Sequence, residues 1–141
     1  MKMDYFEVTG RAKKIYAAMM EPLCRRYGLT KNEMDVLLFL CNNPEFNRAA
    51  DIVTHRGMTK SHVSLSVAEL EKRGLLVRCE NSNDRRAVCL KLTEAARKIA
   101  EEGQKIQRTF FGQLFAGLSK EDMALWQDIM ARVCRNIKNF T

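Results

Sequence analysis

The sequence predicts a mainly α protein with one small β-hairpin. Three observations support this fold class. Apolar residues recur at helical spacing over most of the 141 residues. Two predicted helices, 48–55 and 60–73, are joined by a short turn that contains Gly57, as in a helix-turn-helix. Two stretches of strand-like pattern follow directly, at 75–80 and 87–92. The expected architecture is a winged helix-turn-helix with longer helices on both sides.

The order of elements follows from apolar spacing and from residues that begin or end helices. The six predicted helices cover residues 5–27, 31–41, 48–55, 60–73, 94–116 and 120–139. Hydroxyl and amide side chains are good N-caps, because their oxygen accepts a hydrogen bond from an otherwise unpaired amide. The expected caps are Thr30 with Glu33, Asn47, Thr59, Thr93, and Ser119 with Asp122.

Composition predicts one compact domain over residues 1–141, since no linker, repeat or low-complexity tract interrupts the chain. Neither a signal peptide nor a membrane span is recognisable, so a cytoplasmic protein without a membrane partner is expected. The five cysteines are odd in number and widely spaced, unlike a disulfide framework or a paired metal site. We expect most of Cys24, Cys41, Cys79, Cys89 and Cys134 to be buried thiols.

Positive charge is concentrated in the middle of the chain. The net charge is +7, and residues 48–98 have 11 Lys and Arg against 6 Asp and Glu, while the rest has 13 against 11. A basic patch of this kind is typical of nucleic-acid binding. A solvated basic face without a partner is the alternative.

The helix over 60–73 has polar residues at its start and an apolar stripe further on. The stripe contains Val63, Val67 and Leu70. The polar group consists of Thr59, Lys60, Ser61, His62 and Ser64. Such a helix can insert its N-terminal end into a major groove, where base edges present distinct donor and acceptor patterns. The alternative is that small polar residues only solvate the helix start.

The segment "NSNDRRAVCLKLT", residues 81–93, is expected to place Asp84, Arg85 and Arg86 in a six-residue loop at the hairpin tip. Arginine suits a narrow minor groove, where negative potential is concentrated, because its guanidinium is weakly hydrated. Asp84 could pair with Arg86 and orient it. A surface ion pair without function is the alternative.

The sequence resembles the multiple-antibiotic-resistance-regulator (MarR) family of winged-helix transcription factors. The resemblance rests on "GLTKNEMDVLLFL" (28–40), "MTKSHVSLSVAELEKRGLL" (58–76) and "NDRRAVCLKLTEAARK" (83–98), and on the order of six helices and one wing. It implies a DNA-binding lobe over 29–92 and a helical dimerisation region over 1–28 and 93–141. It also implies that Asp84 and Arg86 enter the minor groove and that Ser61, His62 and Ser64 lie on the recognition helix. Leu65 departs from the pattern, because many members have arginine there.

The terminal helices have more apolar surface than one domain needs, which predicts a homodimer. By resemblance, the dimer would bind near-palindromic double-stranded DNA as a repressor and be released by a small aromatic or lipophilic effector. Candidate effector-binding residues are Tyr16, Met19, Met20, Tyr27 and Met34.

Parts of the sequence also fit two other functions. Cys24, beside Arg25 and Arg26, could act as a thiol-based redox sensor, since positive charge favours thiolate. A winged-helix module that binds RNA or protein is a further alternative. No catalytic motif is recognisable, and the only histidines, His55 and His62, both lie in the helix-turn-helix. We therefore expect no enzymatic activity, no metal and no cofactor.

Overall fold

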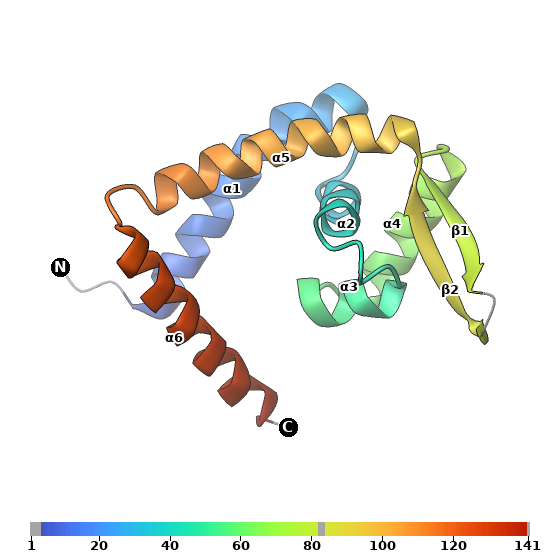
Figure 1. Ribbon diagram of the computed structural model, residues 1–141. Helices are drawn as coiled ribbons and strands as arrows, with labels where there is room; N and C mark the ends of the chain where they lie inside the picture. Colours follow the sequence, from blue (N-terminus) through green and yellow to red (C-terminus); the bar gives the residue numbers. More distant parts are fainter. Residues whose placement is uncertain (1–3, 82–83, 141) are drawn as a thin grey trace. The chain divides into compact units, whose positions relative to one another are not determined.

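The computed structural model describes residues 4–81 and 84–140, without the side chains of residues 81–87. Within the described residues, six helices and one two-stranded antiparallel sheet follow one another along the chain (Figure 1). Their bounds are α1 Tyr5–Tyr27, α2 Lys31–Asn42, α3 Ala49–Arg56, α4 Lys60–Lys72, β1 Leu76–Asn81, β2 Asp84–Leu92, α5 Glu94–Leu114 and α6 Lys120–Lys138. The chain divides into two compact units, Met1–Phe110 and Phe111–Thr141.

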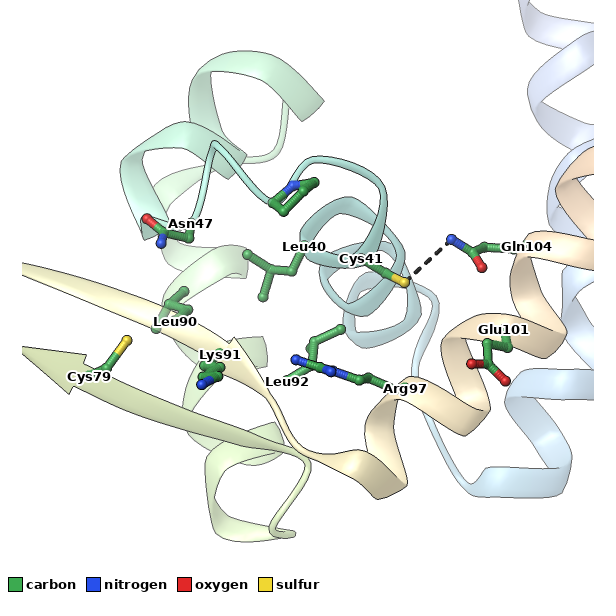
Figure 2. A pocket seen from close by; sticks show the side chains of 11 residues that line it. Leu40, Cys41, Asn47, Cys79, Leu90, Lys91, Leu92, Arg97, Glu101 and Gln104 are labelled. Carbon is green, nitrogen blue, oxygen red and sulfur yellow. Dashed lines mark hydrogen bonds between the residues drawn. The ribbon is translucent and has the colours of Figure 1, made fainter.

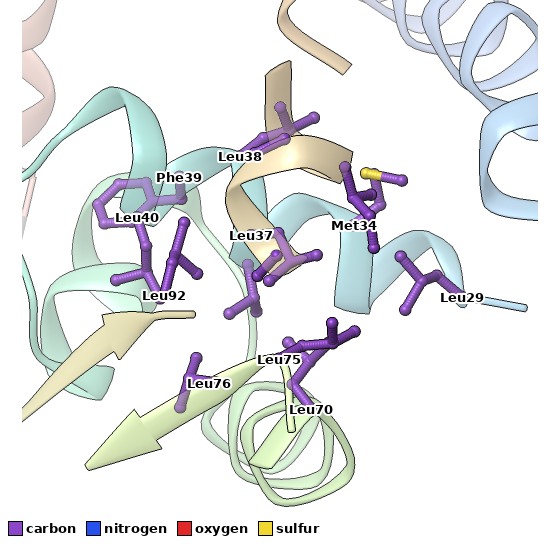
Figure 3. Packing of buried hydrophobic residues seen from close by; sticks show 14 of the residues in the cluster. Leu29, Met34, Leu37, Leu38, Phe39, Leu40, Leu70, Leu75, Leu76 and Leu92 are labelled. Carbon is purple, nitrogen blue, oxygen red and sulfur yellow. The ribbon is translucent and has the colours of Figure 1, made fainter. Parts of the chain in front are cut away.

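The core of the first unit is built around α2. All eight residues from Glu33 to Leu40 are buried, so this helix is covered on every side. Figure 3 shows its leucines packed against Leu70 of α4, Leu75 and Leu76 at the start of the hairpin, and Leu92 at its end. The predicted burial of Val63 and Val67 is confirmed, with 1% and 2% of their surface exposed. The apolar stripe of α4 is therefore used to anchor this helix to the core.

Most of the predicted caps are confirmed. Thr30 Oγ1 accepts a hydrogen bond from the Glu33 amide at 3.1 Å, and the Glu33 carboxylate accepts one from the Thr30 amide at 2.8 Å. Ser119 and Asp122 form the same reciprocal pair at the start of α6. Gly57, in the turn between α3 and α4, has φ +74°, which a residue with a side chain rarely adopts.

The cap of α3 was predicted at the wrong residue. The N-cap is Arg48, whose amide donates to the Asp51 carboxylate at 3.0 Å, and the helix begins at Ala49. Asn47 has another role: its carbonyl oxygen accepts a hydrogen bond from the Leu90 amide at 2.7 Å. This bond ties the start of the helix-turn-helix to β2, and it could not be seen from the local sequence.

The hairpin is longer than predicted. β2 begins at Asp84, so Asp84, Arg85 and Arg86 belong to a strand and not to a six-residue loop. The strands pair from Leu76 with Leu92 to Glu80 with Val88, and after an irregularity Asn81 pairs with Asp84. Polar side chains do not prevent this extension, because the hydrogen bonds of a ladder are made by the backbone.

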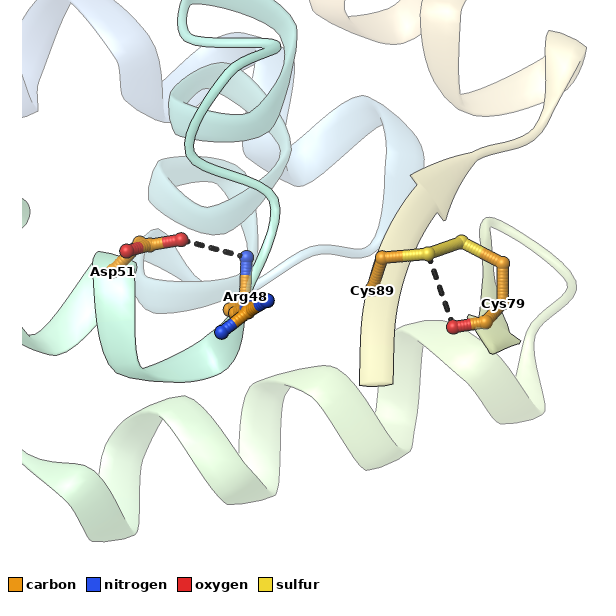
Figure 4. Close-up of a disulfide and its surroundings, with 4 residues drawn as sticks. All are labelled: Arg48, Asp51, Cys79 and Cys89. Atoms are coloured by element: carbon orange, nitrogen blue, oxygen red, sulfur yellow. Dashed lines mark hydrogen bonds between the residues drawn. A yellow bond between two sulfur atoms is a disulfide. The ribbon is translucent and has the colours of Figure 1, made fainter. Parts of the chain in front are cut away.

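Cys79 and Cys89 form a disulfide across the hairpin, which corrects the expectation of unpaired thiols (Figure 4). The two residues are direct partners in the strand register, with their Cα atoms 5.0 Å apart. Among the other cysteines, Cys24 is buried, Cys41 is half-buried and Cys134 is exposed. Only Cys24 is a buried thiol, so the expectation that most of the five cysteines are buried thiols was wrong.

Large apolar side chains remain exposed on α1 and in the second unit. On α1 these are Tyr5, Phe6, Val8 and Ile15. Among its described residues, α6 has no buried side chain, and its exposed apolar stripe consists of Leu125, Trp126, Ile129, Met130, Val133 and Ile137. Within the part of the chain that the structure describes, no helix is long and apolar enough to cross a bilayer.

Candidate nucleic-acid interface

The α4 helix presents its polar N-terminal half to solvent. Its buried residues are Val63, Ser66, Val67 and Leu70, which lie on one side of the helix. The predicted contact residues Thr59, Lys60, Ser61, His62 and Ser64 are all exposed. Thr59 Oγ1 caps the helix by accepting a hydrogen bond from the His62 amide at 3.1 Å. The structure therefore gathers these five residues at one accessible helix end.

Contacts at the other end of α4 fix the orientation of the helix. The Arg73 guanidinium donates to the carbonyl oxygens of Tyr27 at 2.6 Å and Gly28 at 2.8 Å, where α1 ends. Glu71 accepts from Arg78 of β1 at 2.6 Å. These bonds hold the C-terminal end of α4 against α1 and the hairpin, so the polar end is presented on a fixed support.

The chemistry available at the exposed end suits an anionic, polar partner. Hydroxyl groups of Ser61 and Ser64 can donate and accept, the imidazole of His62 can do both, and Lys60 supplies positive charge. The first amides of a helix also favour a phosphate group. Leu65, which follows this group, is 70% exposed although it is apolar.

The hairpin forms the second part of the candidate interface. It follows α4 directly, and the Asn47–Leu90 hydrogen bond joins it to the segment just before α3. The disulfide links its two strands in the middle of the ladder. The side chains of Asp84, Arg85 and Arg86 lie outside the described ones, so the pairing of Asp84 with Arg86 stays a prediction.

The five candidate effector-binding residues have different surroundings. Met34 is fully buried and Met20 is 3% exposed, so both are core residues in this state. Tyr16, Met19 and Tyr27 are half-buried. Met20 borders one cleft, together with Cys24 and Leu29, and Tyr27 borders another, beside Arg73 and Ile99.

A chain of polar side chains connects Tyr16 with α2 and α5. The Tyr16 hydroxyl accepts a hydrogen bond from the Gln107 amide at 3.0 Å, and the Gln107 carbonyl accepts one from Asn42 at 3.0 Å. Gln104 donates to Asn42 at 2.9 Å. Burial raises the pKa of Tyr16, so this phenol is neutral near pH 7. Sequence spacing gave no sign of this connection between three helices.

A cleft of about 500 Å³ lies beside the same segment (Figure 2). Leu40 and Cys41 of α2, the end of β2, and the first turns of α5 line it. Figure 2 shows Arg97 and Glu101 on α5 beside this cleft, with Gln104 donating to the Cys41 thiol. None of the five candidate effector-binding residues is among its lining residues.

The surroundings of Cys24 oppose thiolate formation. Burial, followed by the negative charges of Asp35 and Glu21, raises the pKa of this thiol. The arginines expected to lower it are engaged elsewhere: Arg25 pairs with Glu21, and Arg26 with Glu102. Among the described residues, no group of three or more His, Cys, Asp or Glu could hold a metal ion.

The sequence and the structure both resemble those of known transcriptional regulators. A model of the MarR family matches residues 27–87. The HTH-type transcriptional regulator FarR of Neisseria gonorrhoeae is 25% identical over 126 residues, which are 89% of this chain and 85% of FarR.

Two solved structures extend the likeness to nearly the whole chain. A MarR-family regulator of Listeria monocytogenes, solved with a 26mer DNA, has a TM-score of 0.81 at 18% identity, covering 97% of this chain and 90% of that one. NadR, solved with 4-hydroxyphenylacetate, has a TM-score of 0.76 at 24% identity, covering 94% of each chain. The predicted fold class, mainly α with a winged helix-turn-helix, is confirmed.

Proposed function

Because this chain belongs to the MarR family of transcriptional regulators, we propose that it is a homodimeric, sequence-specific DNA-binding repressor released by a small-molecule effector. The observation that carries the proposal is the exposed polar end of α4 on a buried apolar anchor. In this proposal Thr59, Lys60, Ser61, His62 and Ser64 contact the major groove. The 26mer DNA in the complex of the Listeria regulator supports DNA as the partner.

The wing completes the DNA contact in this proposal. Arg85 and Arg86 reach the flanking minor groove, and Asp84 orients Arg86. Support comes from the position of the hairpin directly after α4 and from the excess of positive charge in residues 48–98. The lobe over 29–92 would then make every DNA contact.

A second copy of the chain is proposed as the partner of the exposed apolar residues on α1 and α6. Leaving so much apolar surface in water is unfavourable, at about 25 cal/mol per Å². Residues 1–28 and 93–141 would form the dimerisation region of a single functional domain. Two-fold symmetry would place two recognition helices about one DNA turn apart on a near-palindromic operator.

For the effector we propose a small aromatic or lipophilic molecule that contacts Tyr16, Met19, Met20, Tyr27 or Met34. The 4-hydroxyphenylacetate bound to NadR supports this chemical class. Tyr16 belongs to the polar chain between α1, α5 and α2, so a ligand there would act on helices that support the DNA-binding lobe. The protein would act in the cytoplasm, without enzymatic activity.

The redox alternative has less support than effector release, because the pKa of Cys24 is raised rather than lowered. An RNA-binding winged helix stays a second candidate, since the basic lobe suits any polyanion. Duplex DNA is favoured because a deep, narrow RNA major groove does not admit an α-helix.

Selection of bound duplexes from a random-sequence pool tests the proposal. We expect enrichment of a near-palindromic sequence, with protection of two half-sites whose centres lie about 10 base pairs apart. Structured RNA should compete poorly at the same salt concentration. Failure to enrich any duplex would exclude sequence-specific DNA binding, and stronger binding to RNA would favour the alternative.

A further inference from the structure

Leu65 is an apolar side chain on a helix face that is otherwise polar. It is 70% exposed, while Val63, Val67 and Leu70 already supply the apolar anchor of α4. In an α-helix, residues three and four apart share one face, so Leu65 lies next to His62 and Ser61. The core therefore does not explain Leu65, and its neighbours belong to the proposed DNA contact.

A leucine in a major groove makes a selective contact, because it has no hydrogen-bond donor or acceptor. Packing leucine against a polar base edge would remove water from groups that then lack a partner, which is unfavourable. The thymine C5 methyl group is the apolar feature that distinguishes one base pair from the others in this groove. Leucine at this position thus favours thymine.

We propose that Leu65 is a specificity-determining residue that packs against the C5 methyl group of a thymine in each operator half-site. This inference rests on the proposed function. Ser61 and Ser64 have short side chains, so they leave the longer leucine side chain free to reach the base. One turn later, Ala68 offers only a methyl group, and Glu69 has a negative charge that phosphate would repel. Among the residues of α4, Leu65 is therefore the one large apolar side chain that is exposed on this face.

Replacement of thymine by deoxyuridine tests the inference, because uracil keeps the hydrogen-bonding edge and lacks only the methyl group. The full-length protein is titrated with its selected operator and with duplexes substituted at one thymine at a time, at fixed salt. We expect one position per half-site at which deoxyuridine weakens binding about fourfold, the effect of one methyl group in an apolar contact.

Variants at Leu65 assign this effect to the side chain. Leu65→Ala should bind the thymine operator about as weakly as the wild type binds the deoxyuridine duplex, and it should no longer distinguish the two. Leu65→Met keeps an apolar side chain of similar size and should keep the discrimination. Because position 65 is exposed, both variants should melt within a few degrees of the wild type.

Two results would overturn the inference while leaving the proposed function intact. One is an operator in which no thymine position is sensitive to deoxyuridine. The other is a Leu65→Ala variant whose affinity falls by the same factor for all duplexes while deoxyuridine still weakens its binding. That result would indicate that Leu65 contacts the sugar-phosphate backbone of the DNA and not a thymine methyl group. Failure to select any operator would instead contradict the proposed function itself.

Discussion

Asp35 is a buried carboxylate whose charge is only partly compensated. Its side chain is 9% exposed and pairs with Arg56 at 3.3 Å. Burial nevertheless raises the pKa of Asp35 above 3.8, against the opposing effects of Arg56 and Lys31. A carboxyl whose pKa is raised by folding binds protons more tightly in the folded state, so its contribution to stability is lost as pH rises through the folded-state pKa.

Asp35→Asn should therefore gain stability relative to the wild type as pH increases. The unfolding free energy of the variant minus that of the wild type is expected to be more positive at about pH 7 than at about pH 4. Urea unfolding at several pH values measures it. Glu45→Gln, which neutralises an exposed acid, serves for comparison. A difference for Asp35→Asn that does not change with pH would contradict the raised pKa.

In the proposed complex, Arg86 should contribute a large part of the affinity of the hairpin for DNA. Arg86→Ala is expected to weaken operator binding by about 1–3 kcal/mol, because a minor-groove guanidinium is lost. Arg132→Ala removes the same charge from α6, where Arg132 pairs with Asp128. Fluorescence anisotropy at fixed salt compares the two. Equal affinities of Arg86→Ala and wild type would refute the wing contact.

Two glycines of α5 have opposite surroundings, which gives a test of helix packing. A Cβ atom at Gly103 would lie 2.8 Å from Leu38 Cδ2, and Leu38 is itself 2% exposed. A Cβ atom at Gly112 would meet nothing within 4 Å. Close approach of α5 to α2 therefore requires glycine at 103 only.

Gly103→Ala should destabilise the protein by about 1–3 kcal/mol through overpacking. Gly112→Ala should stabilise it by about 0.5–1 kcal/mol, because alanine restricts the unfolded chain and favours the helix. Thermal unfolding of both variants measures this. The same sign of effect for the two substitutions would show that the α5–α2 contact is described wrongly.

The disulfide in the hairpin determines how many cysteines can react with a thiol reagent. The chain has five cysteines, of which Cys79 and Cys89 are paired. After denaturation without a reductant, a thiol reagent should modify three cysteines, and after reduction it should modify all five. Mass spectrometry counts the modified sites. Five reactive thiols in protein that has never been reduced would contradict the pairing.

Most elements could be predicted from the sequence because their signals are local. The bounds of α1 and the capping pairs at Thr30 and Ser119 agree with the prediction. The features that were not predicted depend on contacts between residues far apart in the chain. The Asn47 carbonyl oxygen accepts a hydrogen bond from Leu90 of β2. Cys79 and Cys89 become neighbours only because the two strands pair in this register.

The candidate interface was predictable in part for the same reason. Polar residues at the start of α4 and an apolar stripe after them are visible as a pattern. The docking of Arg73 onto the end of α1 joins residues more than forty positions apart, so no spacing rule indicates it. The surroundings of Tyr16 likewise depend on how three helices pack.

At the scale of the whole molecule, the exposed stripe of α6 should be covered by a second copy. Ile129→Asp is expected to raise the dimer dissociation constant by more than about a hundredfold, because a charge would be buried without a partner. Ala131→Asp adds the same charge on the opposite side of the helix and should have little effect. Analytical ultracentrifugation measures both.

Trp126, the only tryptophan, reports on the same surface from within the native sequence. It is 45% exposed in one chain, and its emission should shift to longer wavelength when the dimer dissociates on dilution. A folded wild-type monomer at micromolar concentration would contradict the dimer.

Competition between duplexes distinguishes sequence-specific binding from general affinity for DNA. The wild-type protein is bound to its selected operator and titrated with the same operator or with a duplex of identical composition in scrambled order, at one salt concentration. The operator should compete at least about a thousandfold better than the scrambled duplex, as specific complexes do. Equal competition by the two duplexes would contradict sequence-specific binding.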